Sequence, residues 1–88
     1  MPLKFTGDVK VEKSTGDLQV LAYLGEVPVR CVVRRAAVTA GLNGFHISDG
    51  QALELYYARK TEIQGIASQR FDNGENLPTV SRSDMPVH

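Results

Sequence analysis

The stretch "DLQVLAYLGEVPVRCVVR", residues 17–34, decides the fold of this chain. It holds two runs rich in β-forming residues, 17–24 and 27–34, and only Gly25 and Glu26 separate them. A two-residue loop that begins with glycine is typical of a type II′ turn, which joins neighbouring strands in a tight hairpin. The stretch therefore predicts an antiparallel hairpin.

The turn also fixes a strand register. One face of the hairpin is then apolar throughout, with the pairs Leu24 and Val27, Ala22 and Val29, Val20 and Cys31, and Leu18 and Val33. The other face is mixed, with the pairs Tyr23 and Pro28, Leu21 and Arg30, Gln19 and Val32, and Asp17 and Arg34. A slip of one residue would mix the two faces, so the pattern favours this register.

Pro28 limits where another strand can join the hairpin. In this register its nitrogen points away from the partner strand, so the missing N–H removes no hydrogen bond within the hairpin. A further strand could accept no hydrogen bond from that position. We therefore expect the beginning of the second strand to be a sheet edge.

Cys31, the only cysteine, lies on the apolar face between Val29 and Val33. That face carries no His, Lys or Arg that would favour the thiolate. We therefore interpret Cys31 as a small apolar core residue. A reactive thiol, alone or with His46 as its base, is the alternative.

A long helix gives the strongest helical signal in the chain. Ser48 and Gln51 match a capping box, and Asp49 suits the positive end of the helix dipole. An apolar stripe at helical spacing follows, comprising Ala52, Leu55, Tyr56, Ile63, Ile66 and Ala67, with Leu53 and Phe71 at its shoulder. Asn73-Gly74 is typical of a helix end, so the pattern predicts a helix over residues 49–72.

Shorter segments complete the predicted architecture. Residues 4–13 favour an edge strand or an extended arm, and the alanine-rich segment 34–42 favours a helix of about two turns. Residues 77–83 contain a short β-like run around Val80. We expect residues 83–88 to form a flexible tail.

Together these elements predict an α+β fold. It consists of an antiparallel sheet of three to four strands, with a short and a long helix packed on one face. Because 88 residues leave room for one core only, we expect a single domain over residues 1–88.

Composition excludes several classes of protein. Ten acidic and ten basic residues cancel, so no overall charge attracts nucleic acid or an anionic membrane. A lone cysteine forms no internal disulfide. No signal peptide and no run of about 18 apolar residues occurs, so we expect a cytoplasmic protein without a membrane partner.

The sequence offers few groups for catalysis or metal binding. The two histidines are His46 and His88, and no Cys-x-x-Cys or His-x-x-x-His spacing occurs. No glycine-rich phosphate loop is present either. We therefore expect no catalytic site, no metal site and no cofactor.

Three arginines form the local feature that most suggests binding. Arg30 and Arg34 share the mixed face of the hairpin, and Arg35 follows at the corner before the short helix. Such a trio could hold a carboxylate, a phosphate or a nucleic-acid backbone. The alternative is a solvated sheet face on which Arg34 pairs with Asp17 and Arg30 covers Leu21.

Three further residues are candidates for a protein interface. Tyr23 lies on the mixed sheet face, and Tyr57 lies on the long helix outside its apolar stripe. Arg59 interrupts that stripe, either extending past the sheet edge or facing a partner.

These segments resemble a known family. Phe5, the run 18–23, the turn at Gly25-Glu26 and "VRCVV" resemble the small bacterial domain-of-unknown-function family numbered 1488. "IQGIASQRFDNG" and "TVSRSDM" resemble that family's helix end and final segment. This chain departs from it at Val33-Arg34, where the family has Ile-Ser, and in an acid-poor first helix. The resemblance implies the α+β fold and, because the family has no established activity, implies no reaction.

Three functions remain open at this point. The leading interpretation is a small non-catalytic cytoplasmic protein that binds a protein partner or itself, for example as a dimer. The second is an accessory regulator, for instance of transcription, that contacts nucleic acid or an anionic metabolite through Arg30, Arg34 and Arg35. The third is a thiol-dependent enzyme that uses Cys31.

Overall fold

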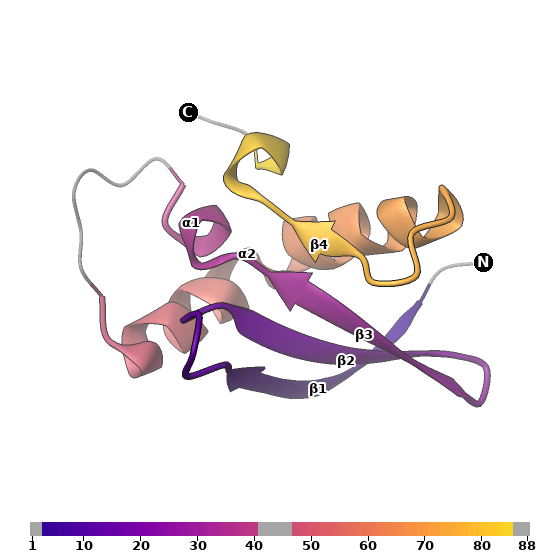
Figure 1. The fold of residues 1–88 in the computed structure, drawn as a ribbon, viewed down its shortest axis with the longest axis horizontal. Coiled ribbons are helices and arrows are strands. Elements are labelled where there is room, and N and C mark those ends of the chain that lie inside the picture. The colour runs from indigo at the N-terminus through magenta and orange to yellow at the C-terminus, as the bar shows by residue number, and fades with distance from the viewer. Residues whose placement is uncertain (1–2, 41–46, 86–88) are drawn as a thin grey trace.

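A computed structural model describes residues 3–40 and 47–85 of the chain (Figure 1). Within these residues, four strands form one sheet in the order β1-β2-β3-β4, and both helices lie on one side of it. The strands are β1 (Lys4–Val11), β2 (Leu18–Leu24), β3 (Val27–Val33) and β4 (Thr79–Val80). The two α-helices of this part of the chain are α1 (Arg35–Val38) and α2 (Asp49–Asp72), and a short 3-10 helix, η1 (Arg82–Asp84), follows β4.

The hairpin of β2 and β3 has the predicted register at the seven pairs that lie within the two strands, from Leu18 and Val33 to Leu24 and Val27. The eighth predicted pair, Asp17 and Arg34, lies just beyond the strand ends. Gly25 has a φ of 62°, whereas no described residue other than glycine has a positive φ. A type II′ turn requires a positive φ at its first central residue, here Gly25, and a negative φ at its second, here Glu26.

Two glycines with open space around them give a matched test of this turn. Gly25→Ala should lower the free energy of unfolding by about 1–2 kcal/mol, because an L side chain is strained at positive φ. Gly65→Ala, on the exposed face of α2, should raise it by about 0.5–1 kcal/mol, because alanine favours helix more than glycine does. Urea unfolding measures both effects, and the same sign for both would contradict the assigned turn.

β1 confirms the strand expected over residues 4–13, at the edge of the sheet next to β2. Its register is interrupted: Phe5 pairs with Ala22 but Val9 pairs with Val20, so residues 6–8 all oppose Leu21. β1 therefore bulges away from the rest of the sheet at this point.

The α+β fold class is confirmed, but the sheet is mixed rather than wholly antiparallel. β4 runs parallel to β3, because the chain crosses over through α1 and α2 between these two strands. The pairing covers only the end of β3, where Val32 N–H donates to Pro78 O at 2.8 Å. Among the described residues no strand pairs with the other edge of β3 at its beginning, as Pro28 predicted.

α2 confirms the predicted helix at both ends. The Ser48 hydroxyl accepts from Gln51 N–H at 3.2 Å, and the Gln51 side chain accepts from Ser48 N–H at 2.9 Å. At the other end, Glu75 N–H donates to Arg70 O and Gly74 N–H to Phe71 O, the pattern of a Schellman motif. The helix buries Ala52, Tyr56, Ile63 and Ala67 in one core with the apolar face of the hairpin.

α1 is shorter than predicted. It spans one turn, and its buried residues are Ala37 and Val38. Residues 39 and 40 form a turn, and the remainder of the expected helix, 41–42, lies outside the described residues, as does His46. No helix of the described residues is long and apolar enough to cross a membrane.

The tail expected over residues 83–88 is packed as far as Met85. Met85 is only 4% exposed because it joins the core, and η1 precedes it. Arg70 holds this end through an ion pair with Asp84. Burial raises the pKa of the Asp84 carboxyl, but Ser81 N–H and the Arg70 guanidinium outweigh burial and hold that pKa below its usual value. Residues 86–88 lie outside the described part of the chain.

Candidate binding surface

One face of the sheet, here called the outer face, lies opposite α1 and α2, and no helix of the described residues covers it (Figure 1). Alternation along β2 places Leu18, Val20 and Ala22 in the core and leaves Gln19 and Leu21 half-buried. The strand register assigns the outer face to Lys4, Lys10, Gln19, Leu21, Tyr23, Pro28, Arg30, Val32 and Thr79. Three cations, Lys4, Lys10 and Arg30, therefore share this face with apolar and neutral polar side chains, and neither α-helix covers it.

A hollow of about 330 Å³ opens in this face where β1 bulges. Its lining is Asp8, Val9, Lys10, Gln19, Val20, Leu21 and Arg30. The Thr6 hydroxyl lies 3.3 Å from Leu21 O, a contact that ties the bulge to β2. The hollow is therefore a consequence of the register, since three residues of β1 stand opposite one residue of β2.

Two cations of the hollow have no partner among the described residues. Arg30 and Lys10 are both exposed, and neither forms a hydrogen bond or an ion pair there. The Asp8 carboxylate contacts the Thr6 hydroxyl at 3.3 Å and is paired with neither cation. The Gln19 amide is occupied, because it donates to Glu12 at 3.1 Å. The free polar groups of the hollow are thus mainly cationic.

Arg34 lies at the end of the same face and is loosely paired. Its Nε is 3.8 Å from Asp17 Oδ2, and its side chain remains 58% exposed. This is the pair that the sequence suggested. Because exposed ion pairs of this length contribute little, Arg34 stays available for a ligand.

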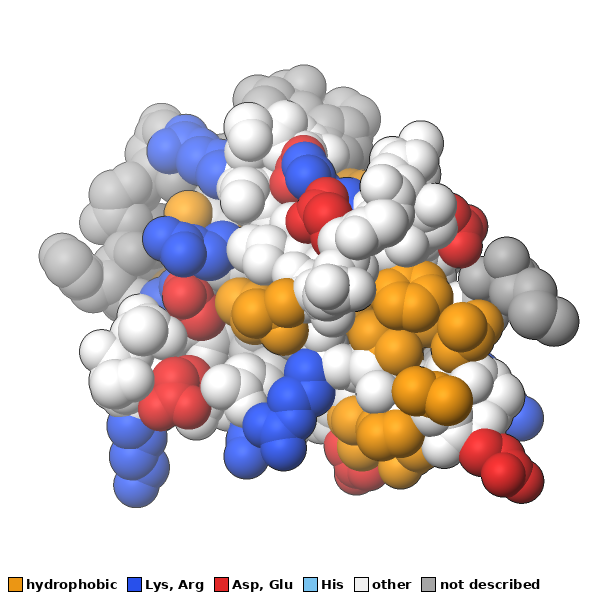
Figure 2. All heavy atoms as spheres, turned by 45° about the vertical axis from the view of Figure 1, so that its right-hand side comes forward, with side chains coloured by type: hydrophobic (Ala, Val, Ile, Leu, Met, Phe, Trp, Pro, Cys, Tyr) orange, Lys and Arg blue, Asp and Glu red, His pale blue; other side chains and the backbone are white. Residues whose placement is uncertain are grey.

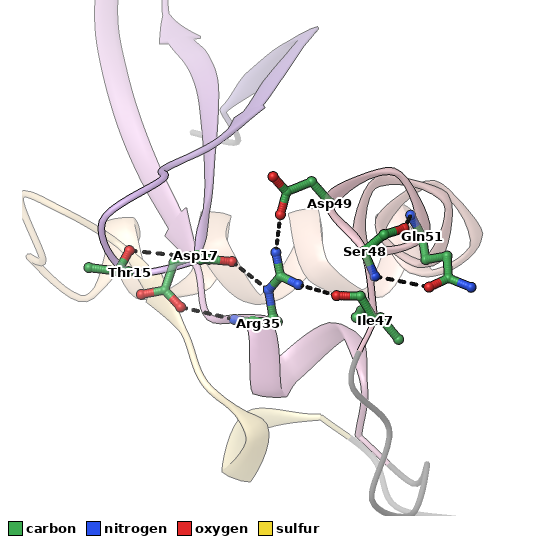
Figure 3. Close-up of polar contacts among 8 residues, drawn as sticks. Thr15, Asp17, Arg35, Ile47, Ser48, Asp49 and Gln51 are labelled. Carbon is green, nitrogen blue, oxygen red and sulfur yellow. Dashed lines mark hydrogen bonds and ion pairs between the residues drawn. The ribbon is translucent and has the colours of Figure 1, made fainter.

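Arg35 is held within the chain instead (Figure 3). Its guanidinium donates to Gly16 O at 2.8 Å, to Ile47 O at 2.7 Å and to the Asp49 carboxylate at 2.5 Å. Its backbone N–H donates to Asp17 Oδ1 at 3.1 Å. We call this set the Arg35 clamp, because it joins the turn before β2, the corner after β3 and the start of α2.

The clamp includes a close approach that favours glycine at position 16. A Cβ atom on Gly16 would stand 3.2 Å from Arg35 Nε, and Gly16 has a φ of 77°. The structure thus separates the three predicted arginines: Arg30 lines the hollow, Arg34 borders the outer face, and Arg35 has its donors engaged. Lys10 is the lining cation that the sequence did not assign to the site, although the alternation of Val9, Lys10 and Val11 is a signal that could have placed it there.

Cys31 lies in the core, with no exposed surface. Burial raises the pKa of its thiol to about 11. Burial likewise raises the pKa of Tyr56, whose hydroxyl accepts from the Gln64 amide at 3.2 Å. Within residues 3–40 and 47–85, no group of three or more His, Cys, Asp or Glu side chains could hold a metal ion.

Comparison with known proteins adds information on the fold. No family model and no curated protein matches the chain. A crystal structure from Shewanella loihica PV-4, described as a protein of unknown function from the DUF1488 family, superposes with a TM-score of 0.80 over 91% of this chain and 92% of that one. The two chains share one fold. At 14% sequence identity the match with the DUF1488 protein confirms the resemblance for the fold alone.

Apolar side chains are also exposed away from the outer face of this DUF1488-like fold. Val27 at the hairpin turn and Leu77 before β4 are 61% and 53% exposed, and Tyr57 on α2 is 51% exposed. Figure 2 shows hydrophobic side chains gathered on the side of the molecule that lies at the right of Figure 1. Arg59 is half-buried on α2. These residues offer contact area, but none of them lines the hollow.

Proposed function

We propose that the chain is a small non-catalytic binding protein that holds a protein partner, or a second copy of itself, on the outer face of its sheet. The observation that carries the proposal is the outer face, on which Leu21, Tyr23 and Val32 are half-buried. Two cations of the same face, Lys10 and Arg30, have no partner among the described residues. Protein interfaces combine apolar or aromatic contact area with arginine in this way. We place this activity in the cytoplasm, as the sequence suggested.

Photo-crosslinking from two tyrosine positions tests the surface directly. A photoreactive amino acid in place of Tyr23 on the outer face should give a discrete crosslinked product in cells. The same amino acid in place of Tyr57, which is exposed on α2, is the matched control and should give none. Mass spectrometry then identifies a partner or a second copy, and purified components should re-form the complex. Equal crosslinking from both positions, or from Tyr57 alone, would reject the outer face as the binding surface.

The second candidate function is that of a regulator that contacts nucleic acid or an anionic metabolite. Two observations favour it: Arg30 has no described partner, and Arg34 pairs with Asp17 only at 3.8 Å. The Arg35 clamp assigns the third arginine to structure, so this candidate depends on Arg30 and Arg34. Binding that falls steeply with salt and is lost in the variant Arg30→Ala with Arg34→Ala would favour it over a protein partner.

A further inference from the structure

The hollow in the outer face is lined by two cations, Lys10 and Arg30, and by one carboxylate, Asp8, so its excess of one positive charge suits a single anionic group. Lys10 comes from β1 and Arg30 from β3, so the two cations flank the β2 residues between them. Both line the same hollow of about 330 Å³, and neither has a described partner. A bound carboxylate could therefore form charge-assisted hydrogen bonds without breaking any existing ion pair.

The surroundings of the hollow favour a protein ligand over a nucleic acid. The aromatic side chain of the outer face, Tyr23, is not part of the lining, so the hollow itself offers no aromatic surface on which a base could stack. The chain carries no net charge that would attract a polyanion. Pro28 and Val32 continue the face beyond the hollow with apolar surface, which suits the side chains that flank an acidic residue in a protein segment.

We infer that the hollow receives an acidic side chain of the protein partner, held between the Arg30 guanidinium and the Lys10 ammonium. The inference rests on the proposed function and names the chemistry of the partner. The contact is partly exposed to solvent, so its strength should fall as salt concentration rises.

Titration of the isotope-labelled protein with a short peptide of alternating glutamate and leucine tests this assignment. Backbone amide signals of Leu21 and Arg30 should shift on binding. Arg30→Gln should weaken binding about tenfold, and Lys10→Gln several-fold, because each removes a charge-assisted contact. The matched controls Arg82→Gln and Lys60→Gln replace exposed cations outside the hollow and should change the affinity less than about twofold.

Three other probes complete the experiment. A peptide with glutamine in place of glutamate should bind about tenfold more weakly, whereas inorganic phosphate and a short oligothymidylate should shift the hollow signals less than the acidic peptide does. Four results would each overturn the inference. The glutamine peptide could bind as tightly as the acidic peptide, or the control variants could lose as much affinity as Arg30→Gln and Lys10→Gln. The protein could also prefer phosphate or oligothymidylate, or it could fail to bind the acidic peptide. Crosslinking from position 23 is a separate readout, so the proposed function can hold if this assignment fails.

Discussion

In the folded protein, Cys31 should react with a thiol reagent at least about a hundred times more slowly than in the unfolded chain at the same pH. The pKa of its thiol rises from 9.0 to about 11, which alone lowers the thiolate fraction at neutral pH about a hundredfold. Burial without exposed surface adds steric protection, so reaction requires opening of the structure. The rate of a colorimetric thiol assay, with and without denaturant, measures the ratio.

An internal control makes this measurement sharper. Thr61→Cys adds an exposed thiol on α2, so the variant should react in one fast and one slow phase. Because the pKa of Cys31 is raised on folding, its contribution to stability is complete below pH 9.0 and is lost as the pH rises towards 11. Rapid labelling of native Cys31 near neutral pH would contradict the buried assignment and restore the thiol-enzyme hypothesis.

Arg35→Ala should lower the free energy of unfolding by about 2–4 kcal/mol, the largest loss expected from a single polar side chain in this chain. The substitution removes three donors, and it leaves Gly16 O and Ile47 O without their guanidinium partner. It also removes the ion pair with Asp49 at the start of α2. Urea unfolding followed by circular dichroism measures the loss.

The neighbouring arginine supplies a matched control for the clamp. Arg34→Ala removes the same side chain one residue earlier, but the one ion pair that Arg34 forms among the described residues is 3.8 Å long, and the Arg34 side chain is 58% exposed. We expect the free energy of unfolding of Arg34→Ala to change by no more than about 0.5 kcal/mol. The stability loss of Arg35→Lys should lie between those of Arg34→Ala and Arg35→Ala, because an ammonium cannot reach three separate acceptors with the geometry of a guanidinium. Equal losses for Arg34→Ala and Arg35→Ala would contradict the clamp.

The elements that the sequence predicted correctly depend on local signals. The hairpin register follows from the alternation of 18–24 and 27–33 and from Gly25, and these all lie within one short stretch. The bounds of α2 follow from Ser48 with Gln51 at one end and Gly74 at the other. Such signals act over a few residues, so they can be recognised without knowledge of the tertiary structure.

The features that it missed depend on contacts between distant segments. Arg35 bonds to carbonyl groups of Gly16 and Ile47, and a backbone acceptor has no residue-type signature. The parallel pairing of β4 depends on where α2 returns the chain. The hollow at Lys10 appears only once β1 is aligned with β2, because the three-to-one mismatch at Leu21 is a property of the pair rather than of either strand.

The two borders of the sheet also influence how copies of the protein behave when crowded. Along β1 the row of backbone groups is broken by the bulge over residues 6–8. At the other border β4 has only 2 residues, and Pro28 breaks the row along the part of β3 that β4 does not pair with. Neither border presents the long, regular template on which strands of other molecules add one after another into fibrils. High concentration should therefore bring copies together through side chains on their surfaces and not through growth of a continuous cross-β filament.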